Sequence, residues 1–120
     1  MVLVDTSVWV RHLRKGDTRL ASLLNNGEVV CHPFIIGEIA CGMLKNRTTI
    51  LSLLQALPMA TEARHEEVMD LIENHSLMGR GLGYIDLHLL ASALATNVPI
   101  WTLDKALSQT SSKMRLAFLI

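Results

Sequence analysis

The sequence predicts an α/β domain of three layers, α/β/α, with a mostly parallel central sheet. Short apolar runs alternate along the chain with amphipathic segments, and turn signals separate them at short intervals. This alternation is typical of a parallel sheet that helices cover on both faces. The 120 residues, half of them apolar, suffice for a single core. We therefore expect one domain over residues 1–120.

The first half of the chain gives two strand and helix units. Residues 2–5 (VLVD) predict a buried strand, and residues 7–15 predict a helix that ends at Gly16. Residues 18–27 predict a second short helix that ends in Asn-Asn-Gly, and residues 28–33 predict a strand. A strand that leads directly into a helix is the repeating unit of the predicted fold.

The segment at residues 33–46 (PFIIGEIACGMLKN) predicts the next helix. It begins with proline, which suits a first helical turn, and its apolar residues lie on both sides of Glu38. We expect this helix to be largely buried.

The second half of the chain continues the alternation. Its amphipathic segment, residues 61–77, places apolar residues on one side and acids on the other, as on a surface helix. The other predicted elements are a helix at 48–57, a short strand at 58–60, a loop at 79–83, a long apolar helix at 84–97, a strand at 98–104, a short helix at 105–113 and a final strand at 115–120.

Charge and cysteine content restrict the function classes. Eleven basic and eleven acidic residues leave a net charge of zero, so any polyanion must be held locally rather than by a global field. Cys31 and Cys41 lack the spacing of a zinc motif. The N-terminal segment has no signal-peptide pattern, and no apolar run is long enough to span a membrane. We expect a cytoplasmic protein.

Four acids stand in apolar settings, apart from the acidic helix. Asp5 and Asp104 follow predicted strands, and Asp86 lies in the first turn of the long helix. Ligand sites of parallel sheets lie outside the carboxyl ends of the strands. Each aspartate taken alone also fits an ordinary helix cap. Glu38 does not fit that alternative, because a carboxylate among isoleucines is costly to bury without a partner.

Convergence of these four acids would demand a cation, because like charges held together raise one another's pKa and destabilise the fold. Oxygen ligands without a cysteine or histidine cluster select hard ions such as Mg²⁺ or Mn²⁺. Mg²⁺ keeps several waters and is commonly completed by substrate phosphates. The acids therefore indicate phosphodiester chemistry, in which the metal polarises a phosphate oxygen and activates a water for in-line attack.

Four motifs, LVDTSVWV, IIGEIACGML, GYIDLHLLASAL and IWTLDKAL, carry a family resemblance across the chain. In this order and spacing the sequence resembles a PIN-domain ribonuclease, specifically a VapC-type toxin of a type II toxin-antitoxin pair. The resemblance implies that four acids hold Mg²⁺ or Mn²⁺ and position the attacking water: Asp5, Glu38, Asp86 and Asp104. It also implies that nearby hydroxyls support the site: Thr6, Ser7 and Thr102.

The same resemblance implies an endoribonuclease that leaves a 5′-phosphate and a 3′-hydroxyl on RNA, such as a tRNA or a ribosomal RNA. It further implies a homodimer and a VapB-type antitoxin that inserts a peptide near the acids. Four cationic residues are candidates for holding the RNA backbone: Arg11, Arg14, Lys15 and Arg80. The first three form a charge run, which more often is a solvated helix face, whereas Arg80 is the better candidate because its glycine-bearing loop directly precedes the Asp86 helix. None of the five histidines has a metal-ligand spacing, and none is assigned to the site.

Two other functions remain open from the residues. A PIN-like module that binds RNA or protein without cutting would use the acids as caps and structural ligands. A phosphatase of the haloacid dehalogenase kind would use Asp5 as a nucleophile, but such enzymes carry a second acid two residues on, where this chain has Ser7.

Overall fold

The computed structural model describes residues 1–119, in which strands alternate with helices as the sequence predicts. The first helix ends where its glycine predicts, because Gly16 adopts a positive φ there. In chain order the elements are β1 (Val2–Val4), α1 (Thr6–Lys15), α2 (Thr18–Asn25), β2 (Val29–Val30), α3 (Pro33–Ala40), α4 (Arg47–Gln55), α5 (His65–Asn74), α6 (Tyr84–Thr96), β3 (Ile100–Trp101) and α7 (Lys105–Lys113).

The three strands form a parallel sheet in the order β2-β1-β3. Leu3 of the central strand pairs with Val30 on one side and with Ile100 on the other. Single parallel bridges, Cys31 to Met59 and Ile100 to Ala117, extend the two edges. The expected parallel sheet is confirmed. Within residues 1–119 the short strands predicted at 58–60 and 115–120 are only these bridges, and Ile120 lies outside the described residues.

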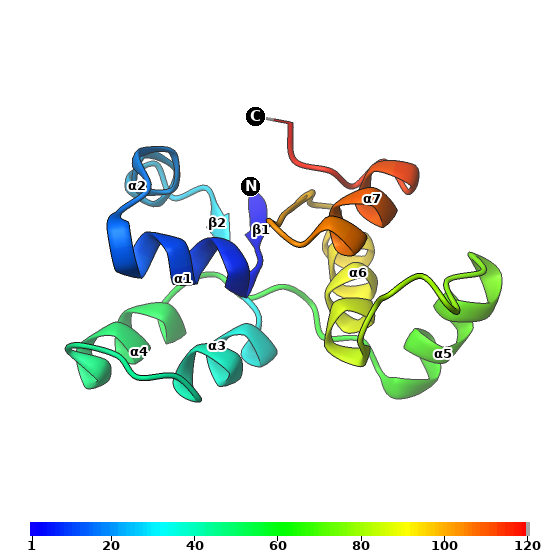
Figure 1. The fold of residues 1–120 in the computed structure, drawn as a ribbon, viewed down its shortest axis with the longest axis horizontal. Coiled ribbons are helices and arrows are strands. Elements are labelled where there is room, and N and C mark those ends of the chain that lie inside the picture. The colour runs from blue at the N-terminus through cyan, green and yellow to red at the C-terminus, as the bar shows by residue number, and fades with distance from the viewer. Residues whose placement is uncertain (120) are drawn as a thin grey trace.

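The core lies around β1 and α6. All three residues of β1 are buried, and α6 contributes the longest buried run of any helix described here, Leu87 to Ala93. Figure 1 shows β1 at the centre, with α1 to α4 on one side of the molecule and α5 to α7 on the other. The α/β class is therefore confirmed. None of the helices in residues 1–119 is long and apolar enough to cross a membrane.

The order of the strands places a topological switch point at the carboxyl ends of β1 and β3. The chain leaves β1 through α1 and α2 and returns in β2, whereas β3 pairs with the opposite side of β1. Connections therefore depart in opposite directions from the carboxyl ends of β1 and β3, which is the arrangement that forms ligand sites in open α/β sheets. Asp5 follows β1, and Thr102 to Asp104 follow β3.

The predicted burial of the helix around Glu38 is wrong. The helix ends at Ala40 rather than at residue 46, and only Ile35 and Ile39 are fully buried. Glu38 is exposed. Successive residues of an α-helix point about 100° apart, so apolar neighbours in the sequence need not surround a side chain in space. Because the Glu38 carboxylate stays in contact with solvent, folding does not incur the desolvation free energy of burying it.

Candidate active site

Asp5 is buried at the junction of β1 and β3, with 7% of its surface exposed. Its N–H donates to the Trp101 carbonyl, which extends the β1 to β3 pairing by one residue. Asp5 occupies the N-cap position of α1, yet its side chain caps no backbone N–H. Capping therefore does not account for this carboxylate.

Two hydroxyls hold the Asp5 carboxylate instead. Ser7 Oγ donates to Asp5 Oδ2 at 2.8 Å, and Thr102 Oγ1 donates to the same oxygen at 2.7 Å. Each hydroxyl also accepts a backbone N–H of the loop after β3: Leu103 N–H bonds Ser7 Oγ, and Asp104 N–H bonds Thr102 Oγ1. Because a hydroxyl has a single proton, these acceptances direct both protons to Asp5. Within residues 1–119, the side-chain hydrogen bonds that Asp5 accepts thus both fall on Oδ2. Because they fix the carboxylate, they also fix the direction of Oδ1.

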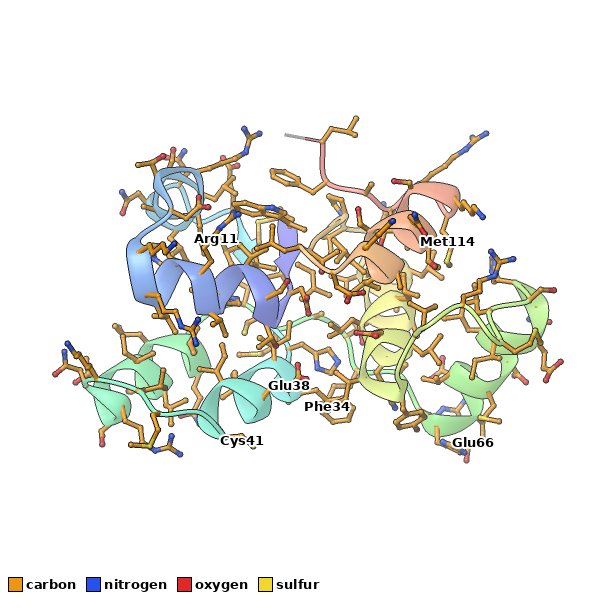
Figure 2. The ribbon with its side chains drawn as sticks, in the orientation of Figure 1. Arg11, Phe34, Glu38, Cys41, Glu66 and Met114 are labelled. Carbon is orange, nitrogen blue, oxygen red and sulfur yellow. The ribbon has the colours of Figure 1, made fainter. Side chains whose placement is uncertain are left out.

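Glu38 reaches the site through the neighbour of Asp5. Thr6 Oγ1 donates to Glu38 Oε1 at 2.7 Å, which links the first turn of α1 to α3. Figure 2 shows Glu38 on α3, where that helix approaches the start of α1. The hydroxyls at Thr6, Ser7 and Thr102 therefore each orient a carboxylate in this structure.

Asp86 and Asp104 complete the acidic cluster from α6 and α7. Asp86 Oδ2 accepts the Gly83 N–H at 2.9 Å, and Asp104 Oδ2 accepts the Leu107 N–H at 2.9 Å, as an N-cap. Burial raises the pKa of Asp86 above its ordinary value, and the negative charges of Asp5 and Asp104 raise it further, against the Gly83 hydrogen bond. The charges of Asp5 and Asp104 therefore act on Asp86. Glu38 is linked to this cluster through its hydrogen bond with Thr6, the residue after Asp5.

The donor set fits a hard divalent cation. The four carboxylates supply only oxygen ligands, the type that Mg²⁺ and Mn²⁺ prefer. The two ion pairs in residues 1–119, Arg11 with Asp17 and Arg64 with Glu67, leave the cluster uncompensated by any lysine or arginine. In the same residues no three acids, cysteines or histidines are yet close enough together to hold a metal. A bound cation would therefore have to draw the carboxylates together.

The candidate RNA-binding residues lie in different surroundings. Arg11 pairs with Asp17 at 2.7 Å, whereas Arg14 and Lys15 are exposed at the end of α1. Arg80 lies in the loop before α6, where its Nε donates to the Ser76 carbonyl at 2.9 Å.

An aromatic and histidine cluster beside the acids was not predicted. It joins α3, α5 and α6 through ring contacts between Phe34 and His88 and between Tyr84 and His88, at centroid separations of 4.8 and 4.6 Å. His65 Nδ1 lies 2.6 Å from the Tyr84 hydroxyl. The one sequence signal for this cluster is that Tyr84 and His88 lie four residues apart, which places them side by side on a helix. The cluster packs the N-terminal end of α6, which carries Asp86.

His32 closes this cluster and caps α3. Its Nδ1 accepts the Phe34 N–H at 3.0 Å, and its Nε2 lies 3.1 Å from Ser92 Oγ. Both bonds are satisfied by the neutral ring with its proton on Nε2. Burial lowers the pKa of His32, with a further lowering by His88 and an opposing effect of Glu62. Burial also lowers the pKa of His88, with His65 adding to the effect and Glu62 opposing it.

The lowered pKa values of His32 and His88 predict that the folded protein loses stability in mild acid. Their pKa values are lower in the folded chain than in the unfolded chain, so the unfolded state takes up protons first as the pH falls through about 6.5. We expect the free energy of unfolding, measured with urea, to fall between about pH 7.5 and 5.5. The substitution His88→Phe keeps an aromatic ring but cannot titrate, so it should make this dependence shallower and leave the part that comes from His32.

Exposed His75 provides the matched control, because His75→Gln removes one histidine without changing the buried cluster. A native profile that is flat across this range, or a His88→Phe profile as steep as the native one, would contradict the assignment.

The sequence of this chain is similar to those of known proteins. The family model of the PIN domain matches residues 2–113, and the chain belongs to the PIN domain family. It is also 44% identical over 118 residues to Ribonuclease VapC32 of Mycobacterium tuberculosis (strain CDC 1551 / Oshkosh), covering 98% of this chain and 95% of that protein. The same values hold for Ribonuclease VapC32 of strain ATCC 25618 / H37Rv. The resemblance predicted from the four motifs is confirmed.

Proposed function

We propose that this protein is a Mg²⁺- or Mn²⁺-dependent endoribonuclease toxin that hydrolyses RNA phosphodiester bonds. The observation that carries the proposal is the uncompensated cluster of Asp5, Asp86 and Asp104 at the carboxyl edge of the sheet, in which the pKa of Asp86 is raised. Membership of the PIN domain family and similarity to proteins named Ribonuclease VapC32 support it.

In this proposal the cation is held by Asp5, Asp86 and Asp104, with Glu38 joining them. A divalent ion there would stabilise negative charge on the phosphate and lower the pKa of a water. The protein's own contribution is orientation. Ser7 and Thr102 fix one oxygen of Asp5, and Thr6 fixes one oxygen of Glu38. Hydrogen bonds of this kind fix the direction in which a ligand carboxylate presents its free oxygen.

The two alternatives fit the geometry less well. A module that merely used its acids as caps would not need Asp5, whose side chain caps nothing. A phosphatase that used Asp5 as nucleophile would need a second acid near it, but Ser7 occupies that position and donates a hydrogen bond to Asp5.

The proposal is tested by incubating the purified protein with a mixed pool of tRNA and ribosomal RNA in Mg²⁺, Mn²⁺ or EDTA. We expect discrete cuts with 5′-phosphate and 3′-hydroxyl ends in either metal and none in EDTA. Cuts that persist in EDTA would refute metal dependence. Binding of RNA without cleavage in either metal would favour the non-cleaving module instead.

We also propose that a VapB-type antitoxin neutralises the enzyme at a groove beside Glu38. The groove has a volume of about 690 Å³ and is lined by residues of α1, α3, α4 and the loop between α3 and α4, including Val10, Leu13, Ile39 and the loop residue Met43. Glu38 stands in its wall, so an apolar peptide in the groove could direct a cation at that carboxylate. The antitoxin should stop cleavage and slow amide exchange in α1 and α4; protection confined to α5 to α7 would contradict this placement.

A further inference from the structure

A small basic pocket lies at the far end of α7 from the acidic cluster. It has a volume of about 170 Å³ and is lined by His75, Leu77, Arg80, Thr110, Lys113 and Met114. Two segments distant in the sequence form it: the chain that follows α5 and the last turns of α7. Figure 2 shows Met114 at the end of α7, on the same side of the molecule as α5. On a chain of zero net charge, this is a local concentration of cationic side chains.

The cationic groups of the pocket are available to a ligand. Arg80 is positioned through Nε, which donates to the Ser76 carbonyl at 2.9 Å. Its two terminal nitrogens remain for an anion, which a guanidinium binds through paired hydrogen bonds. Neither Arg80 nor Lys113 forms an ion pair within residues 1–119, and no carboxylate lines the pocket.

The pocket is aligned with the acidic cluster along a single helix. Asp104 caps the N-terminal end of α7, and Lys113 is its last residue. At a rise of about 1.5 Å per residue, these nine steps span about 13 Å. The loop that carries Arg80 runs against the same helix, since a Cβ placed on Gly81 would lie 3.6 Å from the Ala106 Cβ. This span is several times the rise per nucleotide of about 3.4 Å in duplex DNA, so the pocket and the cluster would bind different phosphates of one strand.

We propose that this pocket, formed by Arg80 and Lys113 with His75 at its edge, is a subsite for an RNA backbone phosphate away from the bond that is cut. The inference rests on the proposed ribonuclease function and assigns to it a path for the substrate along α7. The subsite adds affinity and register without touching the reacting phosphate, because phosphate contacts position a nucleic acid rather than read its sequence.

The test is the salt dependence of RNA binding by the double variant Arg80→Gln/Lys113→Gln. Binding of a labelled single-stranded RNA is measured in EDTA from about 50 to 300 mM KCl. We expect affinity at least about 10-fold below native at low salt. The slope of log K against log salt should be shallower by about 0.7 for each phosphate that the variant no longer neutralises. Arg47→Gln, an exposed arginine at the start of α4, is the matched control and should leave both values unchanged.

Cleavage kinetics separate this subsite from the acidic cluster. In the double variant KM should rise while kcat stays near native, because no group at the reacting phosphate is changed. If the native protein cuts no RNA, the proposed function fails, while the binding series still tests the pocket. Native affinity and slope in the double variant would overturn the subsite. At constant ionic strength, millimolar inorganic phosphate should weaken RNA binding by the native protein more than by the double variant; an equal effect on both proteins would also overturn the subsite.

Discussion

The substitution Asp5→Asn should reduce RNA cleavage by at least about 100-fold and leave the fold intact. Asn keeps the shape of the side chain, and its oxygen can still accept from Ser7 and Thr102, which bond the Asp5 carboxylate at 2.8 and 2.7 Å. Its amide group, however, would present hydrogens where a cation needs a negative oxygen. Activity is measured by single-turnover cleavage of an end-labelled RNA in Mn²⁺, and folding by urea denaturation.

Asp70→Asn, on the exposed acidic face of α5, is the control and should cut RNA at the native rate. Cleavage by Asp5→Asn within a few-fold of native would show that Asp5 serves only to join β1 and β3. If Asp5→Asn loses cleavage because it unfolds, the Asp86→Asn variant tests whether the negative charge of the cluster is needed.

The second large effect concerns Asp86→Asn, which should abolish cleavage and, in EDTA, raise Tm by a few degrees. Burial and the charges of Asp5 and Asp104 raise the pKa of Asp86. A carboxyl whose pKa is raised by folding favours the protonated form in the folded state. Its ionised form at neutral pH therefore costs stability relative to the unfolded chain. Asn removes that charge and can still accept the Gly83 N–H through its oxygen.

Asp17→Asn is a control of opposite sign. Asp17 caps α2, and its pKa is lowered by the Leu20 N–H and by Arg11, so its charge stabilises the fold above about pH 4. Removing it should lower Tm. Added Mn²⁺ should raise the Tm of the native protein and leave that of Asp86→Asn unchanged. A lower Tm for Asp86→Asn in EDTA would show that its charge is compensated in the folded protein.

Much of the fold could be predicted because its local signals agree with its tertiary structure. β1 is short and wholly apolar, α1 ends at a glycine that adopts a positive φ, and α2 leads into Asn-Asn-Gly. The outer strands were the exception. At 58–60 and within 115–119 the chain makes one bridge each, because pairing at a sheet edge depends on how the neighbouring helices place the chain.

The site was predictable where a residue type follows a strand. Asp5 and Thr102 come after parallel strands, whose carboxyl ends must share one edge of the sheet, and the two side chains bond at 2.7 Å. The burial of Glu38 was wrong because successive residues of a helix point about 100° apart, so Glu38 is exposed although Ile39 next to it is buried. That all four acids act together stays a prediction.

Features that depend on distant segments could not be predicted. The basic pocket forms because the loop before α6, which contains Arg80, lies against the end of α7, which contains Lys113. Lys113 is part of no recognisable sequence motif. The aromatic and histidine cluster likewise arises from the packing of α3, α5 and α6, although its histidines look isolated in the sequence. Spacing along one helix cannot reveal contacts between helices.

Whether the four carboxylates form one divalent-cation site is best decided by calorimetric titration of Mn²⁺ into the RNA-free protein at about pH 7.5, where unperturbed carboxyls are ionised. We expect saturable binding by the native protein and by Asp70→Asn, and its loss in Asp5→Asn and in Asp86→Asn. Native protein that binds no Mn²⁺, or equal binding in all four proteins, would contradict a shared cation site.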